Sequence, residues 1–141
     1  YQGDIDWNSV AADGVVTALE DWIRETDAVA KHYIGPSSLK ALQAIRSGIP
    51  AEEAGISGTT CGGIMRTPSA FLWKTDQGED ELEESILTSL MPTHYTSEAL
   101  EAAGAYGFAL RKAFLGGSQE EILDAAQANG AVPEMNVSGV W

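Results

Sequence analysis

The sequence has very little cysteine and no long apolar run. Cys61 is the single cysteine among 141 residues, so it has no partner for an internal disulfide and belongs to no CxxC metal motif. This cysteine usage fits a reducing interior, and we expect a cytoplasmic location. No apolar run approaches the roughly 18 residues that a membrane-spanning helix needs, and no signal peptide is visible. We therefore expect no membrane partner.

Basic residues are also scarce. Lysine and arginine number 8 against 21 aspartate and glutamate residues, which gives a formal net charge of -13. A surface of this sign repels phosphate backbones at long range, so we expect no nucleic acid partner. The acidity itself favours solubility, or life in salty surroundings, over an acidic docking surface.

Strand patterns are missing as well. No alternation of apolar and polar residues extends over a useful length, apart from a weak one in the tail, whereas helical spacing recurs in several segments. The hydrophobic fraction of 44% and the charged fraction of 21% are ordinary for a folded chain. We therefore predict an all-α fold, a compact bundle of about six helices. Residues 1–141 would form a single α-helical domain or a fragment of a larger one.

The predicted helices are bounded by ordinary start and stop signals. Gly35-Pro36 breaks the chain before one helix and Gly48 ends it, while Ser118 and Glu121 form a capping box before the last one. Pro68 marks a kink or a new turn within an apolar segment. The predicted helices cover residues 8–24, 39–46, 50–54, 81–90, 98–115 and 118–129.

The helix over residues 98–115 is predicted to be the longest, and it is unusually small-sided. It contains Gly104 and Gly107 among several alanines, and each glycine costs roughly 1 kcal/mol relative to alanine. Such a cost is tolerable where other helices approach closely on several sides. We therefore predict that this helix is central in the bundle.

A glycine-rich segment, residues 58–66, is the first candidate for chemistry. Its glycines let the backbone turn sharply, and successive N–H groups that lead into a helix start suit an anion such as phosphate. Thr59 and Thr60 add hydroxyl donors. The alternative is a tight connection between two helices, with Arg66 as a structural ion-pair partner, and spacing alone favours this alternative. The segment is not a Walker motif, because GK[ST] is absent.

His94 is the second candidate. It follows Thr93 just before a predicted helix, where a histidine can donate to a phosphate or a ribose, or carry a proton. Alternatively, Thr93 and His94 satisfy loop carbonyls and cap the helix. Cys61 has no nearby base in the sequence and is interpreted as inert rather than reactive. No paired carboxylates demand a metal ion.

The order of these motifs resembles the ADP-ribosylglycohydrolase family, which includes the dinitrogenase reductase activating glycohydrolase. The order is residues 34–38, a helix, residues 53–55, the glycine segment 58–66, Thr93-His94 before an alanine-rich helix, and residues 115–118. The likeness covers most of residues 30–125. Its most specific part is the glycine segment ending in Met65-Arg66, with Thr93-His94 at the right distance.

The resemblance implies an all-α hydrolase that cleaves the N- or O-glycosidic bond of ADP-ribose attached to a protein or small molecule. It implies magnesium or manganese ions as cofactors, and ADP-ribose or an ADP-ribosylated substrate as partner. Arg66 would hold the loop in place. The ligand-binding residues that it implies are Gly58, Thr59, Thr60, Cys61, Gly62 and, lining the same cleft, His94.

Two departures from the family's pattern bear on activity. Cys61 stands where the family has asparagine, which donates and accepts hydrogen bonds more strongly than a thiol does. The acidic clusters that hold the family's metal ions are not found in this sequence, so no metal ligand and no catalytic residue is assigned. Without those ions no Lewis acid activates water.

We therefore expect the chain to be the central portion of such a hydrolase, with the metal site supplied by missing sequence or by another chain. A homodimer or a second chain would then complete the fold. The alternative is a non-catalytic module that binds ADP-ribose or a nucleotide, or that serves as a helical interaction scaffold.

Overall fold

The computed structural model describes residues 7–72 and 74–129 of the chain. Within those residues it contains helices and no strand, which confirms the predicted all-α fold. No described helix is long and apolar enough to cross a membrane. The elements are α1 (Trp7–Thr26), α2 (Pro36–Arg46), α3 (Ala51–Ala54), the 3₁₀ turns η1 (Gly55–Ser57) and η2 (Ile64–Arg66), α4 (Thr67–Leu72), α5 (Glu79–Leu90), α6 (Ser97–Phe114) and α7 (Gln119–Asn129).

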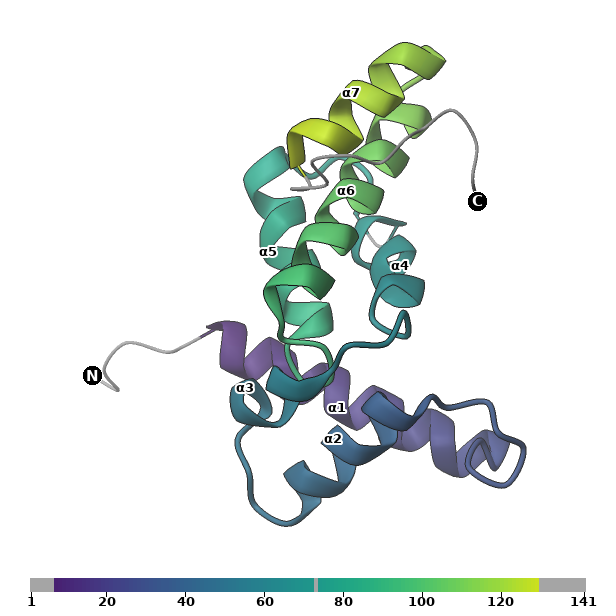
Figure 1. Ribbon diagram of the computed structural model, residues 1–141, viewed down its shortest axis with the longest axis vertical. Helices are drawn as coiled ribbons and strands as arrows, with labels where there is room; N and C mark the ends of the chain where they lie inside the picture. Colours follow the sequence, from purple (N-terminus) through teal and green to yellow (C-terminus); the bar gives the residue numbers. More distant parts are fainter. Residues whose placement is uncertain (1–6, 73, 130–141) are drawn as a thin grey trace.

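The helices form two groups, as Figure 1 shows: α1, α2 and α3 lie together at one end, and α4 to α7 form the other group. Helix α6 packs against α4, α5 and α7, so it is central within its own group, whereas α1 contacts α5 and α3. The prediction that α6 is the longest helix is wrong, because α1 has 20 residues and α6 has 18. Helix α1 continues until Asp27, whose φ of 54° leaves the right-handed helical region.

Helix α4 is the element that raises the number of helices above the expected six. The sequence placed Pro68 at a kink or a new turn, and the structure puts it in the first turn of α4. A proline is tolerated there because its missing N–H would have no helical acceptor. The short helix brings Phe71 into the core of the second group, where this side chain is fully buried.

The apolar core of the second group lies between α4, α5 and α6. Glycine in α6 makes the approach possible, because a Cβ atom on Gly107 would lie 2.5 Å from Ile86 Cδ1. A Cβ atom on Gly104 would likewise lie 2.8 Å from the carbonyl oxygen of Asn129, at the end of α7. The core residues are Ala70, Phe71, Leu82, Ile86, Leu90, Ala99, Ala103 and Phe108.

The helix ends follow the predicted capping chemistry. The amide of Ser118 donates to Glu121 Oε2 over 2.7 Å, and the amide of Glu121 donates to Ser118 Oγ over 3.3 Å. This reciprocal pair is the capping box expected from the sequence. Thr96 caps α6 by accepting a hydrogen bond from the amide of Ala99 over 3.2 Å. Gly48, with a φ of 100°, ends the turn after α2.

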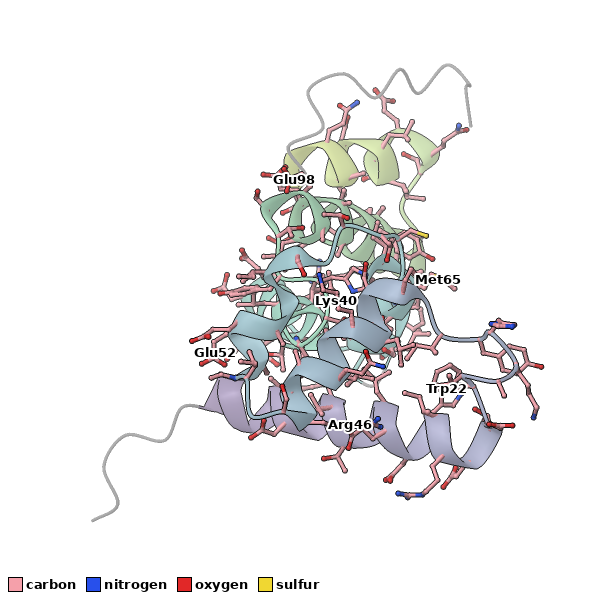
Figure 2. All side chains as sticks on the ribbon, turned by 60° about the horizontal axis from the view of Figure 1, so that its bottom comes forward. Trp22, Lys40, Arg46, Glu52, Met65 and Glu98 are labelled. Atoms are coloured by element: carbon pink, nitrogen blue, oxygen red, sulfur yellow. The ribbon has the colours of Figure 1, made fainter. Side chains whose placement is uncertain are left out.

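A smaller apolar cluster joins the two groups. Ala12 of α1, Ala51 of α3 and Met91 at the end of α5 are buried together. In the first group, Arg46 of α2 forms an ion pair with Glu20 of α1 over 2.7 Å, and Figure 2 shows Arg46 between the two helices. The apolar cluster holds α3 beside the end of α5, and η1 and the glycine segment follow α3 along the chain.

Candidate functional site

At η1 and at the start of the glycine segment, the backbone lies very close to the backbone of the turn between α5 and α6. The amide of Tyr95 donates to the carbonyl oxygen of Gly55 over 2.7 Å. A Cβ atom on Gly55 would lie 2.0 Å from the carbonyl oxygen of Met91, and one on Gly58 would lie 1.9 Å from that of Thr93. Only glycine fits at these two positions, because any side chain would collide with backbone atoms that cannot turn away. The turn between α5 and α6 is therefore pressed directly against the glycine segment.

The later glycines of the segment lie over His94. A Cβ atom on Gly63 would lie 2.9 Å from His94 Cβ. One on Gly62 would lie 3.4 Å from His94 Cε1 and 3.6 Å from Ser38 Oγ. The fold thus brings together the two sequence candidates, the glycine segment and His94, although they are far apart along the chain.

His94 has no solvent-exposed surface, so it lies beneath the segment rather than on its outer side. Its Nδ1 lies 2.8 Å from Thr93 Oγ1, and its Nε2 lies 3.0 Å from Thr60 Oγ1. Both ring nitrogens therefore have hydroxyl partners. Thr60 is exposed and connects the buried imidazole to the outer face of the segment.

Burial, and after it the nearby positive charge of Arg66, lowers the pKa of His94 from 6.5 to about 4. The imidazole is consequently neutral at neutral pH. A group with this pKa is poorly matched to proton transfer near pH 7. The geometry therefore favours hydrogen bonding by His94 over the proton-carrying role that the sequence also allowed.

Arg66 ties the far end of the glycine segment to α5. Its Nη2 donates to the carbonyl oxygen of Ser89 over 3.1 Å and, through a short hydrogen bond, to Thr93 Oγ1. Burial lowers its pKa to about 10, which leaves it cationic at neutral pH. Its Nε has no hydrogen-bond partner among residues 7–72 and 74–129. It also forms no ion pair with any of them, so the ion-pair alternative is replaced by hydrogen bonds to a carbonyl and a hydroxyl.

The outer rim of the segment carries unused backbone donors. Thr59, Thr60 and Cys61 are exposed, and their amides donate to no acceptor in the described part of the chain. Successive free N–H groups can bind an anion where they converge on it. Cys61 itself is a free, exposed thiol on the same rim. Met65, just beyond the rim, projects outward (Figure 2).

Acidic side chains do not gather into a metal site within the described residues. No group of three or more histidine, cysteine, aspartate or glutamate side chains there could hold an ion. The acids at the start of α5 are engaged at the surface instead: Glu81 pairs with Lys74 over 2.6 Å, and Glu79 with Arg111 over 3.6 Å. The residues at hand therefore do not fit the family's metal ions. Asp4 and Asp6 lie outside the described residues.

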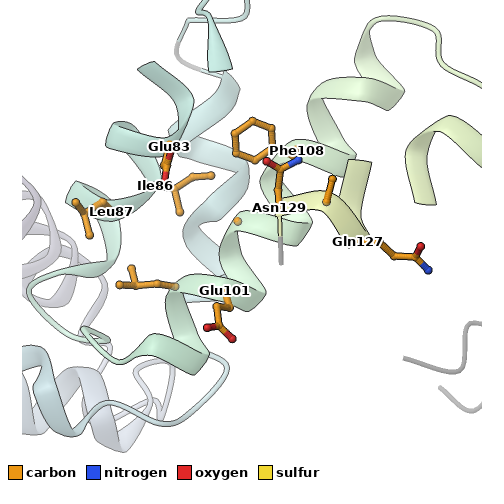
Figure 3. A pocket seen from close by; sticks show the side chains of 10 residues that line it. Glu83, Ile86, Leu87, Glu101, Phe108, Gln127 and Asn129 are labelled. Atoms are coloured by element: carbon orange, nitrogen blue, oxygen red, sulfur yellow. The ribbon is translucent and has the colours of Figure 1, made fainter. Parts of the chain in front are cut away.

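A groove lies between α5, α6 and the end of α7, with a volume of about 530 Å³ (Figure 3). Carboxylates of Glu83 and Glu101 line it, and they disfavour an anionic ligand. We therefore place the candidate site at the segment and not in this groove. The groove is lined by Glu83, Ile86, Leu87, Leu100, Glu101, Gly104, Phe108, Gln127, Ala128 and Asn129.

Sequence reasoning had singled out most of this site but missed two of its contributions. Ser38 was included only within the motif of residues 34–38, yet its hydroxyl lies beside Gly62 and the residue is largely buried. Thr93 was recognised as a neighbour of His94, but not as the acceptor for Arg66. The serine pair after Gly35-Pro36 is a signal that could have pointed to Ser38. Nothing local indicates the second contact, which joins residues 27 positions apart.

Comparisons with known proteins agree with the motif order. The sequence model of the family described as ADP-ribosylglycohydrolase matches residues 3–136. The chain is 31% identical, over 105 residues, to the uncharacterized protein YegU of Escherichia coli strain K12. That match covers 74% of this chain and 31% of YegU, so the chain spans about a third of its relative's length. No solved structure matches the chain.

Proposed function

This chain belongs to the ADP-ribosylglycohydrolase family, and on that premise we propose that its glycine segment forms one wall of an ADP-ribose cleft. The whole protein would be a hydrolase that cleaves ADP-ribosyl glycosidic bonds. Its substrate would be an ADP-ribosylated protein or small molecule. The wall consists of the exposed rim of residues 59–61 and of Gly62, and both Thr60 and Gly62 lie against His94.

The observation that carries this proposal is the set of free amides on the rim. The N–H groups of three exposed residues, Thr59, Thr60 and Cys61, have no acceptor among the described residues. A pyrophosphate group offers the oxygen acceptors that such a row requires, and it binds through local dipoles without a metal ion. The net charge of -13 repels the ligand at a distance, but salt screens that repulsion beyond about 10 Å.

The metal ions of the family need ligands that the described residues do not provide. We propose that carboxylates from outside residues 7–72 and 74–129, or from another chain, hold magnesium or manganese. The ions would supply the Lewis acid that activates water in this class of hydrolysis. The segment's own part is to bind and orient the phosphates.

Exposed apolar side chains support the proposal of a partner. Tyr33, Leu72, Phe114 and Leu115 are all more than half exposed, and apolar surface of this kind favours association. We propose that a second copy or another chain covers part of it. Light scattering should give a mass above that of one chain, and a monomer at high concentration would contradict this.

The free amides can be tested by removing one of them. Thr59→Pro removes the N–H group at the rim, and Thr59→Ala keeps the N–H group while removing the hydroxyl. Calorimetric titration with ADP-ribose should show weaker binding for Thr59→Pro, by roughly tenfold, because a hydrogen bond to a charged group is lost. Thr59→Ala should bind nearly as the native chain does. Equal affinities for all three proteins would remove the proposed site.

A non-catalytic module that binds ADP-ribose is the second candidate, and it is favoured by the same row of free amides, which needs no metal ion. The two are separated by incubating the whole protein, including the segments that would supply the metal ligands, with an ADP-ribosylated peptide, magnesium and manganese. Release of ADP-ribose at a rate that follows protein concentration would establish the hydrolase. Retention of the modified peptide with no release would establish the module.

A further inference from the structure

The hydrogen bonds beneath the glycine segment form a continuous chain from Arg66 to Thr60. Arg66 Nη2 contacts Thr93 Oγ1, Thr93 Oγ1 contacts His94 Nδ1, and His94 Nε2 contacts Thr60 Oγ1. This series of hydrogen bonds starts at the guanidinium of Arg66, which can only donate. The direction of each later bond follows from that start.

Thr93 Oγ1 must accept from Arg66, which leaves its own hydroxyl hydrogen to be placed. Thr93 is fully buried, and His94 Nδ1, at 2.8 Å, is the acceptor within reach among the described residues. If Nδ1 carried a hydrogen instead, Thr93 Oγ1 would receive two donors and its own hydrogen would be buried without an acceptor. Such an unpaired buried donor costs about 1–3 kcal/mol. Donation from Thr93 to His94 is therefore the favoured arrangement.

A neutral imidazole that accepts at Nδ1 carries its hydrogen at Nε2. Nε2 then donates to Thr60 Oγ1 over 3.0 Å. The oxygen of Thr60 is thereby used as an acceptor, and its hydroxyl hydrogen is directed elsewhere. Thr60 is exposed, and its hydroxyl makes no other hydrogen bond with the described residues.

We propose that Arg66 and Thr93 are positioning residues that fix His94 as the Nε2–H tautomer, so that the Thr60 hydroxyl is presented outward as a hydrogen-bond donor. A donor at this position pairs with an oxygen that only accepts, as a phosphate oxygen does. The ligand side of this inference rests on the proposed function, whereas the tautomer does not. The depressed pKa of His94 agrees with a ring that stays neutral.

The tautomer can be read without any ligand. Long-range ¹H–¹⁵N spectra of the chain at neutral pH distinguish a protonated ring nitrogen from an unprotonated one. We expect His94 to show a protonated Nε2 and an unprotonated Nδ1. A protonated Nδ1 would overturn the inference, whatever the affinity for ADP-ribose. No substitution is needed, so misfolding of a variant cannot obscure the answer.

Substitution of Thr93 tests whether the hydrogen bonds from Arg66 through Thr93 determine the tautomer of His94. Thr93→Ser keeps the hydroxyl and should keep the protonated Nε2. Thr93→Val removes the donor to Nδ1 and should shift the ring toward a mixture of tautomers. If the folded Thr93→Val variant has the same ring spectrum as the native chain, Thr93 does not position His94 and the inference fails.

Substitution of Thr60 tests the outward donor, and this exposed position tolerates change. Thr60→Val should weaken ADP-ribose binding by roughly tenfold, and Thr60→Ser should retain most of the affinity. Binding that is equal for Thr60→Val and the native chain would overturn the ligand side of the inference. If the native chain itself binds no ADP-ribose, the proposed function fails, and the ring spectrum still decides the tautomer separately.

Discussion

Two regions of the molecule are held together in different ways: the apolar core of the second helix group, and the junction between the glycine segment and the α5–α6 turn. The core between α4, α5 and α6 is apolar, with side chains such as Phe71, Leu82 and Leu90 fully buried. At the junction between the glycine segment and the α5–α6 turn, buried polar atoms and glycine backbone take their place. An apolar core tolerates the exchange of one apolar side chain for another of similar volume. A buried junction tolerates the loss of a hydrogen-bonding group less well, because the remaining partner is left unpaired. We therefore expect stability to depend most on the first region, and we propose ligand chemistry for the second.

The largest effect on stability is expected in the apolar core. Phe71 is fully buried and lies edge-to-face with Phe114, with the ring centroids 5.4 Å apart. Phe71→Ala should lower the free energy of unfolding by about 4 kcal/mol, because it leaves a cavity that the helices fill incompletely. Urea unfolding measures this. A loss below about 1 kcal/mol would show that the core is not where stability resides.

A nearly equal effect is expected from one methyl group at the junction. In Gly58→Ala the new Cβ atom would lie 1.9 Å from the carbonyl oxygen of Thr93, so the two backbones must separate, at a cost of about 3 kcal/mol. Gly14→Ala is the matched control, since a Cβ atom there meets nothing within 4 Å and alanine favours the helix. Equal unfolding curves for the two variants would refute the close approach.

The buried histidine should make stability depend on pH. The pKa of His94 is about 4 in the folded chain, against 6.5 for an ordinary histidine, so the unfolded chain binds more protons between these values. Stability from this group is complete above pH 6.5 and falls as pH falls toward 4, by up to about 3 kcal/mol in total. His94→Gln should lose this slope, while Phe71→Ala should keep it. A native chain with constant stability across that window would contradict the buried neutral ring.

The smallest expected effect lies away from both regions, at the start of α7. Ser118→Ala removes the hydroxyl that accepts from the amide of Glu121 and should cost about 1 kcal/mol. The ring spectrum of His94 should not change in this variant. A shift of that spectrum would mean that the cap and the junction are coupled, and that the two regions are less separate than the contacts indicate.

The sequence predicted the local structure well because local signals determine it. The capping box at Ser118 and the stop at Gly48 each depend on a few neighbouring residues, and both are present in the structure. The extra helix α4 and the greater length of α1 were missed. Proline in a first turn and a turn at Asp27 are weak signals when their tertiary surroundings are unknown.

The site was predictable as a set of motifs but not as an arrangement. The glycine segment and His94 were both selected, and the family resemblance placed them in one cleft. Neither observation could show that His94 is covered by Gly63 or that Arg66 reaches Thr93. These contacts depend on the packing of η2 against the α5–α6 turn, which follows from the whole fold. From the sequence alone, a loop glycine such as Gly63 could pack against many different side chains.

The most direct test of the account is a map of where ADP-ribose touches the chain. Amide shifts of uniformly ¹⁵N-labelled protein would be followed during titration with ADP-ribose, and with adenosine as a ligand that lacks phosphate. We predict shifts centred on residues 59–63 with ADP-ribose, much smaller ones with adenosine, and none at Leu87 and Phe108 in the α5–α6–α7 groove. Shifts confined to that groove, or no shifts at residues 59–63 at saturating ligand, would contradict the proposal that the glycine segment binds the phosphates.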